Sequence, residues 1–142
     1  MTKDTQYTRT ELGALGEQLA ADHLTALGMR VLQRNWRCRY GELDLIVEDT
    51  DNTVVFVEVK TRTGEVFGGL AEAVSPTKVR RLRRLTGVWL GQQSQAWANI
   101  RIDVIGVRVG RQKTRGDRSG HQLGTSRRTP GGAGGRRIAG VP

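Results

Sequence analysis

Residues 41–60, GELDLIVEDTDNTVVFVEVK, have the pattern of two strands joined by a short turn. Apolar and polar residues alternate along the first half, which places Leu43, Leu45 and Val47 on one face of a strand. The next four residues, DTDN, have the composition of a turn. A second alternating run follows from Thr53 to Lys60. The stretch therefore predicts a β-hairpin whose strands each carry apolar residues on one face.

The register of this hairpin decides where its charged residues lie. Matching the two apolar faces requires a turn of odd length or a bulge, and it sets Asp44 opposite Glu58. The same register sets Glu42 opposite Lys60. Like charges that face each other on a sheet cost up to roughly 1 kcal/mol, so the facing carboxylates predict a divalent cation, Mg²⁺ or Mn²⁺, between them. The alternative is a solvent-facing lattice of salt bridges that holds no ligand.

Lys60 lies two residues after Glu58, and therefore on the same face of the strand. An ammonium group beside metal-bound carboxylates can orient or deprotonate a water molecule, or stabilise charge that develops on a phosphate. The combined pattern, D-x(13)-E-x-K across one hairpin, predicts phosphoryl-transfer chemistry. An E-x-K triplet alone would be a weak signal.

This constellation resembles the PD-(D/E)xK nuclease superfamily. The finer strings GELDLI (41–46) and VFVEVKTR (55–62) resemble the small bacterial YraN-type family, which is itself similar to Holliday-junction resolvases and restriction-endonuclease-like folds. The likeness spans residues 10–108, and its shorter matches are Phe67-Gly68, Glu72-Ala73-Val74 and Lys78. The proline of the superfamily name has no counterpart before Asp44.

The resemblance implies which residues would form a nuclease site. Asp44 and Glu58 would hold Mg²⁺ or Mn²⁺, and Lys60 would help to activate the attacking water. Glu17, within Gly13-x-x-Gly16-Glu17, would complete the metal site from the first helix. A helical wheel places Glu17 at the edge of the apolar arc, and the alternative is an ordinary boundary glutamate.

The elements around the hairpin predict an α/β fold. Thr8 and Glu11 form a capping box for a helix that ends at Gly28, and a strand follows over 29–36. Ser75 and Pro76 begin a second helix, which leads to a strand from Ile100 to Val104. The order is helix-strand-strand-strand-helix-strand, and the right-handed crossover makes the last strand pair parallel. We expect a mixed central sheet flanked by helices, with the restriction-endonuclease-like core that the resemblance implies.

Charge divides the chain of 142 residues near Val109. Residues 1–109 have room for one domain with a net charge of +2, whereas 110–142 hold eight basic residues, one acid and nine glycines. We expect this Gly/Arg-rich tail to be disordered. It is either a flexible arm that sits on phosphates, or a solvated tail whose arginines reflect genomic base composition.

Several classes of protein are disfavoured by the sequence. The longest apolar run is Val54–Val57, far shorter than the ~18–20 residues of a membrane span. The N-terminus lacks the apolar core of a signal peptide, and Cys38 is the single cysteine, so disulfides and Cys-rich zinc sites are not expected. A cytoplasmic protein is the default expectation.

Basic side chains flank the predicted site and suit a nucleic-acid partner, DNA more than RNA. The candidate contacts are Arg34, Arg37, Arg39, Arg62, Lys78, Arg80, Arg81 and Arg84. Two hypotheses follow. The first is a metal-dependent endonuclease acting on structured or branched DNA, with a homodimer implied by the resemblance. The second is a non-catalytic nucleic-acid-binding module on the same fold, or an accessory protein in DNA processing.

Overall fold

The first helix, α1 (Arg9–Ala26), begins at the capping box that the sequence predicts. The Thr8 hydroxyl accepts the Glu11 N–H at 3.2 Å, and the Glu11 carboxylate accepts the Thr8 N–H at 2.8 Å. The helix ends before Gly28, whose φ of 91° lies in the region that favours glycine. Both ends of α1 therefore confirm the local sequence signals.

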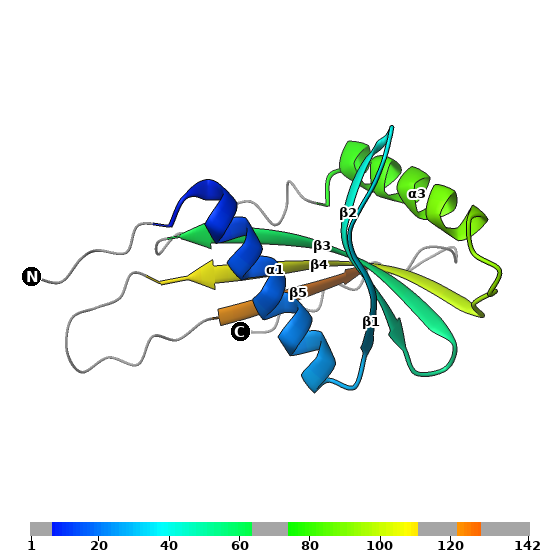
Figure 1. The fold of residues 1–142 in the computed structure, drawn as a ribbon, viewed down its shortest axis with the longest axis horizontal. Helices are drawn as coiled ribbons and strands as arrows, with labels where there is room; N and C mark the ends of the chain where they lie inside the picture. Colours follow the sequence, from blue (N-terminus) through cyan, green and yellow to red (C-terminus); the bar gives the residue numbers. More distant parts are fainter. Residues whose placement is uncertain (1–6, 64–73, 111–121, 129–142) are drawn as a thin grey trace, which may run out of the picture.

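A mixed sheet forms the centre of the computed structural model, which describes residues 7–63, 74–110 and the backbone of 122–128. Its strands lie in chain order, β1-β2-β3-β4-β5 (Figure 1). Only β3 and β4 pair in parallel, and the helix α3 connects them, as the crossover predicts. The bounds are β1 (Arg30–Cys38), β2 (Gly41–Asp49), β3 (Thr53–Thr63), α3 (Pro76–Gly91), β4 (Asn99–Val109) and β5 (Gln122–Arg128).

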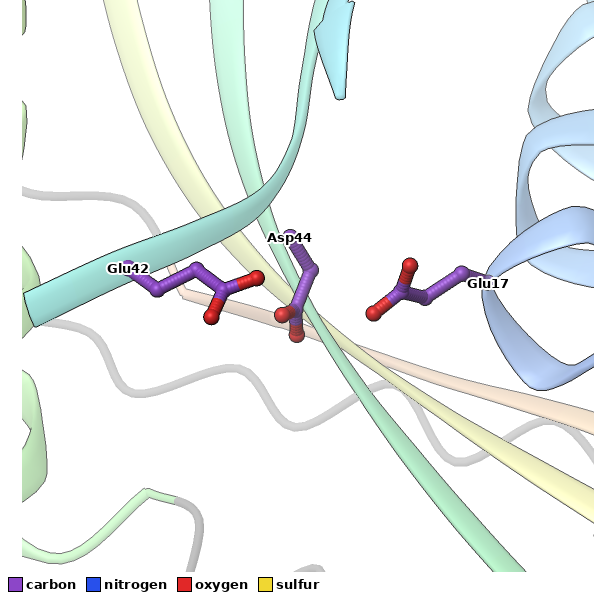
Figure 2. A group of neighbouring side chains, drawn as sticks. All are labelled: Glu17, Glu42 and Asp44. Atoms are coloured by element: carbon purple, nitrogen blue, oxygen red, sulfur yellow. The ribbon is translucent and has the colours of Figure 1, made fainter. Parts of the chain in front are cut away.

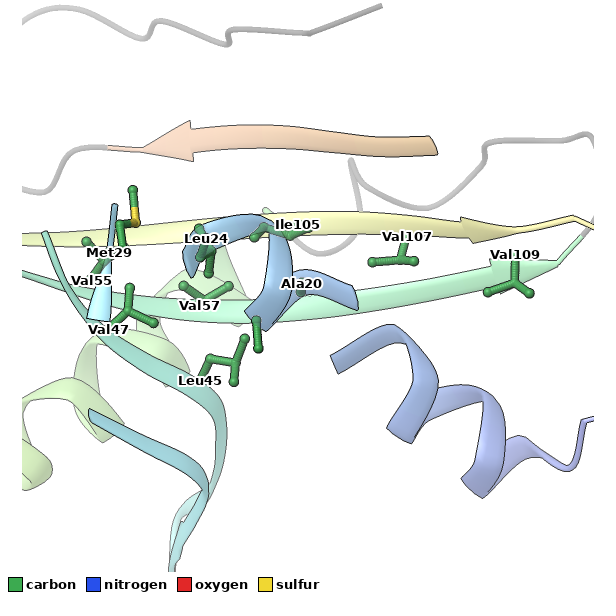
Figure 3. Close-up of a cluster of buried hydrophobic side chains, with 11 residues drawn as sticks. Ala20, Leu24, Met29, Leu45, Val47, Val55, Val57, Ile105, Val107 and Val109 are labelled. Atoms are coloured by element: carbon green, nitrogen blue, oxygen red, sulfur yellow. The ribbon is translucent and has the colours of Figure 1, made fainter. Parts of the chain in front are cut away.

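Each face of the sheet carries its own apolar core. On one face, α1 packs through Ala20 and Leu24 against valines and leucines of β2, β3 and β4 (Figure 3). On the other face, α3 packs against Phe56 and neighbouring side chains. The buried apolar residues of α3 are Val79, Leu82, Leu85 and Trp89. The mixed α/β architecture with helices on both faces is confirmed.

The predicted hairpin register is confirmed for residues 45–49 of β2 and is wrong at Asp44. Leu45 pairs with Val57, and a turn of odd length, 50–52, joins β2 to β3. The pairing stops at Leu45, so Asp44 and Glu58 are not paired across the ladder as predicted.

The reason for this correction is a bend in β2. The β1–β2 hairpin curves away from β3 toward α3 (Figure 1), and Gly41 at its tip approaches the Leu85 side chain. Leu43 consequently joins the α3-side core, whereas Leu45 belongs to the α1-side core. A straight strand would have kept both on one face.

A fifth strand, β5, pairs antiparallel with β4 and falls within the segment expected to form the tail. Residues 111–121 and 129–142, and the glycines at 64, 68 and 69, lie outside the described residues, so the predicted boundary at 109 stays a prediction. Neither helix of the described part combines the length and apolar character that crossing a bilayer requires.

Candidate functional site

The site is built where β2 separates from β3. Asp44 lies one residue beyond the last ladder pair, and its Oδ2 accepts the Val59 backbone N–H at 2.8 Å. The carboxylate therefore takes over a backbone donor of β3 where the paired ladder has ended. This bond fixes Asp44 at the fork between the two strands.

Two further carboxylates converge on Asp44. Glu17 reaches it from α1, and Glu42 reaches it from β2 on the opposite side (Figure 2). One oxygen of each of the three residues lies within 4.8 Å of the others. Hard oxygen ligands at this spacing are the donor set that Mg²⁺ or Mn²⁺ prefers.

Burial and like charge shift the acidities of this cluster. Burial raises the pKa of Asp44 to about 6, against the stabilising Val59 hydrogen bond, and the charges of Glu17 and Glu58 add to the rise. Burial also raises the pKa of Glu17. Ionising the cluster is therefore unfavourable without a neighbouring cation, and a bound cation would offset that cost.

The position of Glu17 depends on a close helix–strand approach. Gly16, the residue before it, packs against Thr61 of β3, and a Cβ at Gly16 would lie 2.9 Å from the Thr61 Cβ and overlap its hydroxyl. Only glycine allows this approach. The Gly16-Glu17 pair therefore brings an acid of α1 to the fork.

Glu58 belongs to the other side of the site. Its side chain is 9% exposed, and its Oε1 lies 3.4 Å from Lys60 Nζ and 3.5 Å from Arg81 Nη2 of α3. Its Oε2 is buried and accepts no hydrogen bond from the described residues. Glu58 is thus close enough to raise the pKa of Asp44, but its Oε1 is paired with two cations and it is not one of the three clustered carboxylates.

Cations gather around Glu58. The charge of Lys60 lowers the pKa of Lys78, which α3 contributes from its first turn. Like-charged groups this close repel one another, and an anionic ligand such as a phosphate would relieve the repulsion. Arg81 is exposed on the same helix.

The tip of the β1–β2 hairpin carries a second basic group. The guanidinium of Arg84 lies 3.6 Å from the centre of the Tyr40 ring, and that of Arg39 lies 4.6 Å from it. Arg39 also donates to the Tyr40 hydroxyl. These cation–π contacts tie the hairpin tip to α3 and hold two arginines in place.

The remaining candidate cations are dispersed. Arg37 pairs with Glu42 at 3.3 Å, and Arg34 donates to Gln18 of α1 at 2.8 Å. Arg62 donates to the Thr61 carbonyl, and Arg80 is exposed on α3. The structure therefore brings Glu17 and Asp44 together and groups Glu58 with Lys60, Lys78 and Arg81.

Sequence reasoning missed Glu42 as a member of the acidic cluster. It was assigned to a pair with Lys60, which the bend in β2 prevents. The signal was nevertheless present, because Glu42 and Asp44 are two residues apart on one strand and so share a face.

Comparison with known proteins gives a consistent result. Residues 16–107 match the model of a family described as "Uncharacterised protein family UPF0102". A "UPF0102 protein" of Mycobacterium avium is 68% identical over 115 residues, which is 80% of this chain and 90% of the relative. A "UPF0102 protein" of Mycobacterium tuberculosis is 65% identical over 111 residues, which is 78% of this chain and 87% of the relative.

Proposed function

This chain belongs to the UPF0102 family, and from its site we propose a metal-dependent endonuclease that hydrolyses phosphodiester bonds in structured or branched DNA. The observation that carries the proposal is the convergence of Glu17, Glu42 and Asp44 at the fork of the sheet. The cations Lys60, Lys78 and Arg81 lie beside Glu58, and positive groups next to an acidic cluster suit a phosphate substrate bound to a metal ion.

The proposed metal ligands are the carboxylates around the fork. Asp44 and Glu17 hold Mg²⁺ or Mn²⁺, and Glu42 joins them because its oxygen lies within the same cluster. Glu58 contributes from the opposite side, where its orphaned Oε2 would gain a partner. When bound, such an ion polarises the phosphoryl oxygen and stabilises the leaving oxygen.

The cations of β3 and α3 have the complementary role. Lys60, held 3.4 Å from Glu58, would orient the attacking water and stabilise negative charge that develops on the phosphate. Backbone phosphates would contact guanidinium and ammonium groups of the same domain, namely Arg34, Arg37, Arg39, Arg62, Lys78, Arg80, Arg81 and Arg84. DNA is proposed ahead of RNA, and a homodimer is proposed on the resemblance alone.

The arrangement of elements supports a restriction-endonuclease-like core. A central hairpin bears the acids, α1 adds one more, and the α3 crossover leads to a parallel strand. This is the order that the superfamily resemblance implies.

A second candidate is a nucleic-acid-binding module without catalysis. One observation favours it, namely that Lys60 and Arg81 already neutralise Glu58. A site whose carboxylate is satisfied by protein cations can bind phosphates without recruiting a metal.

Cleavage assays separate the two candidates. Labelled four-way junction, flap, duplex and single-stranded DNA would be incubated with the wild type in Mg²⁺, Mn²⁺ or EDTA. We expect metal-dependent product that Asp44→Ala and Lys60→Ala both lose by at least 100-fold, as is typical when a catalytic group is removed. Asp22→Ala removes an exposed acid of α1 and serves as the matched control.

The opposite result would favour the binding module. In that case the wild type binds these DNAs equally in Mg²⁺ and EDTA, and no product exceeds that of the Asp44→Ala variant.

A further inference from the structure

We propose that Asn35 is a positioning residue that holds Glu17 and Glu42 together so that both can face one cation. The inference rests on the proposed metal site, but Asn35 was not among the residues that the sequence analysis selected. It lies on β1, which contributes none of the carboxylates.

The amide of Asn35 bridges two acids from different elements. With its nitrogen turned toward the carboxylates, it donates to Glu17 Oε2 at 2.9 Å and to Glu42 Oε1 at 3.1 Å. The opposite orientation would set the amide oxygen against both carboxylates, with no hydrogen to share. Both N–H donors of one amide are thus used on the two acids that flank Asp44.

This contact occupies Oε2 of Glu17 and Oε1 of Glu42. Groups that hydrogen-bond to metal-binding carboxylates orient them, and removing such a group commonly weakens metal binding by roughly 10-fold to 100-fold. Glu42 is also held by Arg37 at 3.3 Å. Among the described residues, Asn35 links Glu42 to α1 by donating one hydrogen bond to Glu42 and another to Glu17.

The backbone at Asn35 supports a specific role. Its φ is 49°, although its neighbours Arg34 and Trp36 pair with Leu45 and Leu43 in a regular ladder. Such a conformation is uncommon inside a strand, and asparagine is among the few residues that adopt it readily. Asn35 lies between these two ladder pairs and is itself not paired in the ladder.

Other residues with this backbone conformation occupy a turn. Asp51 and Asn52 have φ values of 62° and 52° between β2 and β3, away from the acidic cluster. Asn52 therefore offers a matched control, since Asn52→Gly makes the same chemical change in the same backbone region.

The test compares Asn35→Gly with Asn52→Gly in the full chain. Glycine keeps the positive φ and removes only the amide. Mn²⁺ affinity would be measured by electron paramagnetic resonance, and stability by thermal unfolding in EDTA. We expect Asn35→Gly to weaken Mn²⁺ binding about 10-fold, and Asn52→Gly to leave the affinity unchanged.

A double-mutant cycle asks whether the effect passes through Glu42. If Asn35 acts by holding the two glutamates together, most of its effect should vanish once Glu42 is neutral. We therefore expect Asn35→Gly to cause a clearly smaller loss of Mn²⁺ affinity in a Glu42→Gln background than in the wild type. A merely structural residue would cause the same loss in both backgrounds.

The outcomes keep this inference apart from the proposed function. If the wild type binds Mn²⁺ but cleaves no DNA, the proposed nuclease activity is overturned. The role of Asn35 is still supported in that case if Asn35→Gly lowers the affinity for Mn²⁺. Asn35→Gly with wild-type Mn²⁺ affinity overturns the inference, whatever the cleavage result. Wild type that binds no Mn²⁺ overturns both.

Discussion

Asp44 combines two properties that rarely coincide, a carboxylate fixed by a backbone hydrogen bond and a pKa raised by burial. The Val59 N–H lowers that pKa, yet desolvation and the neighbouring Glu17 and Glu58 outweigh it. The fold therefore contains a carboxyl group whose ionised form it disfavours, and such positions are candidates for binding a cation.

The raised pKa has a measurable consequence for stability. Well below pH 3.8, Asp44 is protonated in the folded and unfolded chains, and its contribution to stability is fully present. As the pH rises through about 6, the folded chain must ionise a buried carboxyl that the unfolded chain has already ionised, so stability is lost. The shift from 3.8 to about 6 corresponds to about 3 kcal/mol.

Asp44→Asn should remove this pH-dependent loss. In EDTA the variant should exceed the wild type in the free energy of unfolding by up to roughly 3 kcal/mol at pH 8, and match it near pH 4. Urea unfolding across this range measures the difference. Added Mg²⁺ should stabilise only the wild type. Equal stability of the two proteins at pH 8 would contradict the raised pKa.

The single residues of the site were predictable to different degrees. Asp44, Glu58 and Lys60 stood out through their spacing, and Glu17 through the resemblance. Glu42 was assigned to the wrong partner because strict alternation assumes a straight strand. Sequence periodicity carries no information about a bend that arises when a hairpin tip packs on a distant helix.

At the scale of elements, α1 is docked on β3 through one glycine. Gly16 leaves no space for a side chain against Thr61, whereas Gly13, one turn earlier in α1, has nothing within 4 Å of where its Cβ would lie. The two glycines therefore occupy the same helix in opposite environments. Their contrast gives a direct test of what sets the distance between α1 and the sheet.

Gly16→Ala should destabilise the chain, and Gly13→Ala should not. Overpacking typically costs 1–3 kcal/mol, so we expect a loss of about 2 kcal/mol for Gly16→Ala and a gain of up to about 1 kcal/mol for Gly13→Ala, because alanine favours helix. Thermal unfolding measures both. Gly16→Ala should regain stability when combined with Thr61→Gly, relative to Thr61→Gly alone. An unchanged unfolding temperature of Gly16→Ala would show that α1 is not held this close to β3.

Most elements were predictable because their signals are local. Capping residues mark the start of both helices, and alternation marks β2 and β3. β5 was not predicted, since its sequence, QLGTSRR, has no apolar alternation. Its pairing with β4 is a long-range contact, and such contacts leave little trace in the sequence of the strand itself.

At the scale of the whole molecule, the point where the charge changes lies before the last described strand of the sheet. The excess of positive charge begins after Val109, but the sheet continues to Arg128 through β5. The basic segment therefore includes the strand that covers the edge of β4 from Ile102 to Arg108.

Two truncations should separate these boundaries. A chain of residues 1–109 lacks β5 and exposes the β4 edge, so it should unfold at a lower temperature than the full chain and self-associate. A chain of residues 1–128 keeps β5 and should match the full chain. Thermal unfolding and light scattering measure the two effects. Identical melting of all three chains would mean that β5 contributes nothing to stability.

The run Val54–Val57 lies at the centre of the sheet, and all four of its residues are buried. On the ribosome this run is complete before β4 exists to cover it, and short apolar β segments of this kind are prone to aggregate. Glu58 and Lys60 follow it directly, and flanking charges oppose the stacking of such segments between chains. These two residues would therefore oppose aggregation of the run during synthesis. A poor yield of soluble Lys60→Ala would then reflect the position of the lysine beside this apolar run as much as its proposed role in cleavage.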